Sequence, residues 1–143
     1  MDAADLRIRN LTYELLVELG RAPTSEEATL ATGLDVRESW RRLHEARALV
    51  LDQTGEIRMA HPFSAVATPY RVQVRGRRWY ANCAWDAFGI CAALHTDGRI
   101  ETTCADCGEG LVVEVRDRRP SDETLVFHCL VPAARWWDDI VFT

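Results

Sequence analysis

The sequence predicts an α+β protein with two parts: a winged-helix-like module of three helices at residues 1–62, and a small mixed or antiparallel sheet domain at residues 63–143. Helical apolar spacing and capping signals fill the first part, whereas short alternating runs typical of strands fill the second. With 143 residues, 48% apolar and 27% charged, the chain has the composition of a folded globular protein. We expect one helix of the second part to carry a site cysteine.

Three helices are predicted in the first part. A leucine stripe with helical spacing stops at Gly20, and a capping box of Thr24 and Glu27 opens a second helix that ends at Gly33. Asp35 is expected to cap the third helix. The stripe of the first helix, which should face the core, consists of Leu6, Leu11, Leu15, Leu16 and Leu19.

A hairpin is predicted after the third helix, with residues 50–51 leading in, residues 52–56 turning and residues 57–59 returning. This plan is that of a winged helix, whose third helix enters the major groove in DNA-binding proteins. Duplex DNA is therefore one candidate partner, although the net charge of −5 opposes a chain-wide electrostatic grip on nucleic acid. The alternative is a packing module with a solvated arginine face, formed by Arg37, Arg41, Arg42 and Arg47.

The second part alternates short strands with one helix. Strands are predicted near residues 70–75, 79–80, 100–102, 111–115 and 125–131, and residues 140–142 look like the beginning of another. The helix is expected over residues 83–94, with Asn82 as its N-cap. The tryptophans at 79, 85, 136 and 137 should mostly lie in the core, and some could line an apolar pocket around Cys83.

Cys83 and Asp86 are the candidate catalytic residues and the first candidate metal ligands. Cys83 falls in the first turn of the predicted helix, where unpaired amides and the helix dipole should lower its pKa. Asp86 follows about one turn later and so shares its face. A thiolate beside a carboxylate could bind a soft metal and move a proton. The alternative is a buried cysteine and an aspartate bonded to nearby backbone.

The remaining cysteines offer a weaker metal site. Cys104 and Cys107 form a CxxC turn, which is half of a zinc site, and zinc or copper is a candidate ion. Cys129 could complete the site only through the fold, as could the histidines at 128 and 95, but its apolar run suggests a core position instead. Cys91 should be core, and the histidines at 44 and 61 show no evident partner.

Composition also bounds the compartment and the cofactors. No apolar run approaches the roughly 20 residues that cross a bilayer, and the N-terminal sequence lacks the pattern of a signal peptide. We therefore expect a cytoplasmic protein with reduced thiols and no membrane partner. No glycine-rich phosphate loop is present, so no organic cofactor is expected.

Several segments together resemble the organomercurial (alkylmercury) lyases. They are residues 61–69 (HPFSAVATP), the strand at 70–76, residues 80–86 (YANCAWD), residues 100–108 and residues 137–143 (WDDIVFT). The resemblance covers nearly the whole chain. It implies a winged-helix-like N-terminal module, mercury resistance, and protonolysis of carbon–mercury bonds with mercury(II) as the bound product.

The resemblance also implies roles for residues. Cys83 corresponds to the first mercury-binding thiolate, Asp86 to the proton donor and extra ligand, and Cys104 to a cysteine that looks structural in the family. The family's second catalytic cysteine follows a strand like residues 139–143, and this chain ends before it. Three alternatives stay open: a missing tail, substitution by Cys107 or Cys129, or a soft-metal-binding protein or metal-responsive regulator without lyase activity. The oligomeric state is open as well.

Overall fold

The computed structural model describes residues 2–141, which form four α-helices, one 3₁₀-helix and eight strands. The helices are α1 (Ala3–Leu19), α2 (Ser25–Thr32), α3 (Arg37–Glu45), α4 (Ala84–Ala93) and the 3₁₀-helix η1 (Ala133–Asp138). The strands are β1 (Val50–Leu51), β2 (Ile57–Ala60), β3 (Phe63–Ser64), β4 (Arg71–Val74), β5 (Arg77–Ala81), β6 (Gly98–Thr103), β7 (Gly110–Arg116) and β8 (Arg119–Pro120). The predicted α+β class is confirmed.

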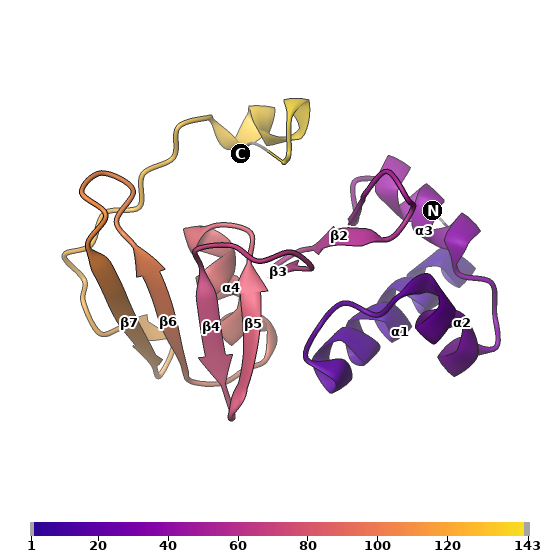
Figure 1. The fold of residues 1–143 in the computed structure, drawn as a ribbon, viewed down its shortest axis with the longest axis horizontal. Helices are drawn as coiled ribbons and strands as arrows, with labels where there is room; N and C mark the ends of the chain where they lie inside the picture. Colours follow the sequence, from indigo (N-terminus) through magenta and orange to yellow (C-terminus); the bar gives the residue numbers. More distant parts are fainter. Residues whose placement is uncertain (1, 142–143) are drawn as a thin grey trace.

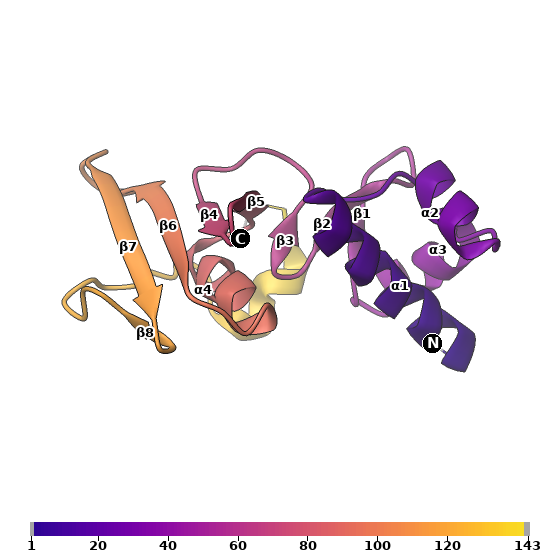
Figure 2. The same ribbon diagram turned by 90° about the horizontal axis from the view of Figure 1, so that it is seen from below.

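All strands belong to one antiparallel sheet, in the order β1-β2-β3-β5-β4-β6-β7-β8. The two-residue strand β3, which the sequence did not predict, joins the β1–β2 hairpin to the larger sheet by pairing with both β2 and β5. Figures 1 and 2 show α1–α3 at one end of the molecule and β6–β8 at the other, with α4 between them. The proposed domain division at residues 62 and 63 stays a prediction.

The end of α1 and both ends of α2 lie where the sequence predicted. A full capping box of Thr24 and Glu27 starts α2, and Gly20 and Gly33 end α1 and α2 in the left-handed region, with φ of 73° and 67°. Glycine adopts this region without the steric cost that a side chain would add. The predicted cap of α3 is shifted by one residue, because Val36 occupies the N-cap and Asp35 instead accepts a hydrogen bond from the Arg37 amide at 3.0 Å.

The buried face of α1 differs from the predicted leucine stripe. Leu6 and Leu19 are 45% and 42% exposed, whereas the buried positions are Asp5, Ile8, Thr12 and Leu16. Polar groups are tolerated there because they have partners on α3, to which they bond across the helix pair. The prediction of the core-facing side of α1 was therefore wrong in part, because hydropathy alone does not show that Asp5 and Thr12 have partners on α3.

Two contacts hold α1 against α3. The indole Nε1 of the fully buried Trp40 donates to Thr12 Oγ1 at 2.9 Å, and Thr12 Oγ1 donates to the Ile8 carbonyl at 2.8 Å. The Arg42 guanidinium donates to Asp5 Oδ1 at 2.7 Å, and this contact holds the pKa of Asp5 well below its usual range. The pair of helices is thus fixed by both packing and specific polar contacts.

The core of the sheet lies under α4, which packs on β4, β5 and β6. Alternate residues of β4, Val72 and Val74, are buried and meet Ile90 of α4 and Ile100 of β6 in one cluster. This alternation is what a sheet with one covered face requires. Cys91 is also buried, as predicted.

The C-terminal part of the chain differs most from expectation. Residues 125–131 form no strand, and every residue from 125 to 130 is exposed. After β8 the chain runs back towards the middle of the molecule (Figure 2), where Trp137 of η1 lies beside His61. The predicted strand at 140–142 is not seen at residues 140–141, and its last residue lies outside the described part of the chain. No helix among residues 2–141 has both the length and the apolar character needed to cross a membrane.

Candidate functional site

Cys83 and Asp86 sit at the amino-terminal end of α4, directly after β5. Cys83 itself is the N-cap residue of the helix, so the prediction that Asn82 would cap it was wrong. Asp86 lies in the first turn, with its side chain 15% exposed, and Cys83 is half-buried. A turn between a strand and a helix therefore places a thiol and a carboxylate at a helix terminus that favours negative charge.

The Asn82 side chain holds the Asp86 carboxylate, and His61 lies beside it. The side-chain amide of Asn82 donates to Asp86 Oδ2 at 2.8 Å, and His61 Nδ1 lies 3.5 Å from the same oxygen. The Asn82 amide is thus engaged with Asp86 instead of capping the helix. The expectation that His61 lacks a partner was wrong, because β2 and β3 bring the 61–63 turn beside the start of α4.

The environment of Cys83 raises the pKa of its thiol. Burial is the main cause, and the negative charge of Asp86 adds to it, whereas the backbone amides of Asp86 and Trp85 lower the pKa without offsetting the rise. The predicted decrease was therefore wrong in direction, since desolvation outweighs the helix terminus here. Burial therefore favours the protonated thiol of Cys83, and the two backbone amides favour the thiolate.

The segment after β8 lies beside this site. The ring centroids of Phe127 and Trp85 are 6.4 Å apart. The Trp137 ring lies edge-on to the His61 ring, with 5.9 Å between their centroids. Cys129 is close enough to Cys83 for its charge to raise the Cys83 pKa. The expectation that Cys129 is a core residue was wrong: it is exposed, and its Sγ donates to the Val131 carbonyl at 3.0 Å.

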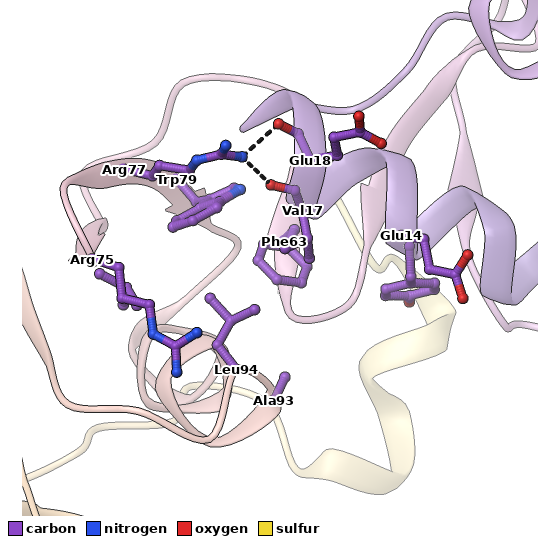
Figure 3. A pocket seen from close by; sticks show the side chains of 11 residues that line it. Glu14, Val17, Glu18, Phe63, Arg75, Arg77, Trp79, Ala93 and Leu94 are labelled. Atoms are coloured by element: carbon purple, nitrogen blue, oxygen red, sulfur yellow. Dashed lines mark hydrogen bonds between the residues drawn. The ribbon is translucent and has the colours of Figure 1, made fainter. Parts of the chain in front are cut away.

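The tryptophans divide between the site and another part of the molecule. Trp85, at the start of α4, is 65% exposed, whereas Trp79 is buried and lines a cavity of about 630 Å³ between α1, the sheet and the end of α4. Figure 3 shows the Arg77 guanidinium at this cavity, donating to the carbonyls of Val17 and Glu18 at the end of α1. Neither Cys83 nor Asp86 lines this cavity.

Comparison with known proteins identifies the family to which the chain belongs. The family model described as "Alkylmercury lyase" matches residues 63–143. The chain belongs to the alkylmercury lyase family. No curated protein matches the chain. Among solved structures, the mercury-bound form of MerB2 matches with a TM-score of 0.65 and 23% identity, over 85% of this chain and 60% of that one.

The structural likeness reaches further than the family match. At 23% identity it shows a shared fold, and its coverage of 85% of the chain includes part of the region before residue 63. The chain spans 60% of the length of that mercury-bound protein. The match to the alkylmercury lyase family confirms the resemblance drawn from the HPFSAVATP and YANCAWD segments. All of the second segment lies within the matched region, as does the first segment from residue 63 onwards.

The other predicted thiol pair, Cys104 and Cys107, does not belong to α4. Cys104 and Cys107 belong to the loop between β6 and β7, where Cys104 is half-buried and Cys107 exposed. The amides of Cys107 and Asp106 and the Cys107 thiol lower the pKa of Cys104. Among residues 2–141, no group of three or more His, Cys, Asp or Glu residues is placed to hold a metal ion. The additional ligands that a closed zinc site needs are thus not assembled in this part of the chain.

The arginines of α3 are largely paired with acids. Arg41 pairs with Glu38 at 2.7 Å and also with Glu45, while Arg42 pairs with Asp5 and with Glu38. Arg37 pairs with Glu56 of the β1–β2 hairpin at 3.2 Å. Ion pairs of this kind compensate the positive charge that would otherwise attract phosphates.

Proposed function

We propose that the protein cleaves carbon–mercury bonds by protonolysis, using Cys83 as the mercury-binding thiol and Asp86 as the acid. The observation that carries this proposal is the placement of a thiol and a carboxylate one helical turn apart at the start of α4, where Asn82 donates to the carboxylate and His61 lies beside it. Membership of the alkylmercury lyase family and the mercury-bound state of a structurally similar protein support it.

The proposed reaction uses Cys83 and Asp86 in turn. The Cys83 sulfur displaces a ligand of the organomercurial substrate and forms a mercury–sulfur bond, and its proton passes to Asp86. Electron donation from sulfur weakens the bond between mercury and carbon. Asp86 then returns the proton to carbon, the carbon–mercury bond breaks, the hydrocarbon leaves, and mercury(II) stays on sulfur. No electron is transferred, and no organic cofactor takes part.

Cys129 is the thiol that we propose as a second mercury ligand. Its charge reaches Cys83, and it lies on the segment whose Phe127 ring packs near Trp85 at the start of α4. A second sulfur would add electron density to mercury and hold the product ion after the hydrocarbon leaves. Asp86, beside Cys83, could supply a further oxygen ligand.

The N-terminal helices and the β1–β2 hairpin form a winged-helix-like module in this proposal, and its role is structural. Tyr13 of α1 donates its hydroxyl hydrogen to the His61 carbonyl at 2.8 Å, which ties the module to the residues around Asp86. The acid-paired arginines of α3 favour this role over DNA binding. We place the protein in the cytoplasm, where its thiols would stay reduced.

Hydrocarbon release tests the proposal. Purified protein is incubated with phenylmercury and a small thiol, and benzene is measured by gas chromatography. C83S should lose activity because the mercury-binding sulfur is gone, and D86A should fall by about 10²–10⁴-fold because a positioned acid contributes that much. E26Q, which changes an exposed carboxylate on α2, is the matched control and should keep full activity.

Two outcomes would contradict the proposal. Intact protein that binds mercury but releases no benzene is a soft-metal-binding protein and not a lyase. Activity that survives in both C83S and D86A would show that the chemistry lies elsewhere in the chain. The variant C129S separates the second-ligand assignment from the first, since it should slow turnover while C83S abolishes it.

A further inference from the structure

The loop between β6 and β7 is a closed turn that carries two thiols. The Cys104 amide donates to the Glu109 carbonyl at 2.8 Å, and the Gly108 amide donates to the Cys104 carbonyl at 2.9 Å. Gly108 has a φ of 74°, a conformation that side chains disfavour, and it lets the chain return directly into β7. The backbone of the turn is thus fixed by its own hydrogen bonds while Cys107 is exposed to solvent.

The interior of this turn is suited to a negatively charged sulfur. The backbone amides of Asp106 and Cys107 and the Cys107 thiol all lower the pKa of the Cys104 thiol. Successive amides that converge in a turn create a concave site for anions, as in many iron–sulfur sites. Two sulfurs in such a turn can bind one ion together, whereas nothing in the lyase chemistry proposed for Cys83 uses them.

The number of ligands selects the kind of ion. Zinc in a structural site takes four protein ligands, and no third His, Cys, Asp or Glu joins this pair among residues 2–141. Soft ions prefer thiolates, and mercury(II) is satisfied by two of them. The pair therefore fits a soft ion that accepts two-coordinate binding.

Strand register places this turn at the same end of the sheet as Cys83. Arg71 of β4 pairs with Tyr80 of β5 on one side and with Glu101 of β6 on the other. Cys83 follows Tyr80 by three residues, and Cys104 follows Glu101 by three residues, in strands that run in the same direction. Figure 1 shows the β6–β7 loop at the end of the sheet where β5 leads into α4. With one strand between them, β5 and β6 are about 10 Å apart.

We propose that Cys104 and Cys107 form a separate two-thiol site that binds mercury(II), or another soft ion of the same coordination, beside the Cys83 site. Each thiol releases one proton to solvent as its sulfur bonds the ion, so binding releases two protons and involves no oxidant or reductant. Its position suits the retention of mercury(II) away from the catalytic thiol, but binding itself does not depend on catalysis at Cys83.

Mercury(II) titration in a background without the other accessible thiols tests the site. The parent for this experiment is C83S/C129S, reduced with a phosphine, in which the buried Cys91 is the only other cysteine. Mercury(II) is added as a glutathione complex, and the ultraviolet absorption of mercury–thiolate bonds is followed as glutathione is increased. We expect one ion per chain, held about 10²–10⁴-fold more tightly against glutathione than in C83S/C129S/C107S, because the second thiol acts at high effective concentration.

Circular dichroism of each variant separates loss of the site from loss of the fold. Because Cys107 is exposed and only its sulfur is replaced, C107S should keep the parent spectrum. Equal retention of mercury(II) by a folded C107S variant would overturn the proposal, and so would zinc binding as tight as mercury binding. Since Cys83 is absent from the whole series, this result is independent of benzene release by the unmodified protein.

Discussion

Replacing Thr12 with valine tests how the N-terminal helices are held together. Thr12 Oγ1 accepts the hydrogen bond of the Trp40 indole Nε1 at 2.9 Å, and Trp40 is fully buried. In T12V the indole N–H would stay buried without an acceptor, since valine fills nearly the same space but offers no oxygen. An unsatisfied buried donor costs about 1–3 kcal/mol, whereas the added methyl group offsets little of that.

Urea denaturation followed by circular dichroism measures this cost. With an m-value of about 2 kcal/mol/M, a loss of about 1–3 kcal/mol lowers the midpoint by about 0.5–1.5 M. A cycle with W40F isolates the contact, because the double variant should recover about 0.5–1.5 kcal/mol relative to the sum of the single variants. The m-value should stay unchanged, which shows that the unfolded state is the same.

The matched control is T32V on α2. Thr32 Oγ1 donates to the carbonyl four residues earlier, at 2.7 Å, as Thr12 does, but it is half-exposed and no indole depends on it. Its replacement should change stability by no more than about 0.5 kcal/mol. If T12V falls within that range, or if the cycle with W40F is additive, the reasoning about the Trp40 donor is refuted.

Three further predictions concern the site and its support. In a variant whose other exposed cysteines are replaced with serine, D86N should lower the pKa of Cys83, because it removes a negative charge that raises this pKa. The pH profile of iodoacetamide alkylation should then shift to lower pH, and an unchanged profile would contradict the prediction. The Asp5–Arg42 pair should stabilise the fold at neutral pH and lose its effect as the pH falls below the ordinary aspartate range, because Arg42 lowers the pKa of Asp5 in the folded state. D5N should therefore be less stable than the parent in urea at neutral pH but equal to it in strong acid, and a constant difference would be the opposing result. Y13F should lose about 0.5–1.5 kcal/mol of stability with the hydrogen bond to the 61–63 turn, and an unchanged urea midpoint would show that this bond contributes nothing.

The sequence predicted correctly those features of the fold that depend on residues close together in the chain. The capping box of Thr24 and Glu27 and the glycines that end α1 and α2 act over three or four positions, so a sequence window contains all the interacting groups. Residues 125–131 show the limit of such windows. Their apolar run resembles a strand, but a strand needs a partner edge, and the fold supplies none to this segment among the described residues.

The sequence by itself determined the family, the α+β class, and the spacing that puts Cys83 and Asp86 on one turn of a helix, because these follow from local order along the chain. Only the tertiary structure decided the surroundings of those groups. It brought His61 to Asp86, and it buried Cys83 enough that desolvation reversed the expected direction of its pKa shift. Burial and charge are summed over all neighbours in space, including residues far apart in the chain, and so they cannot be read from spacing alone.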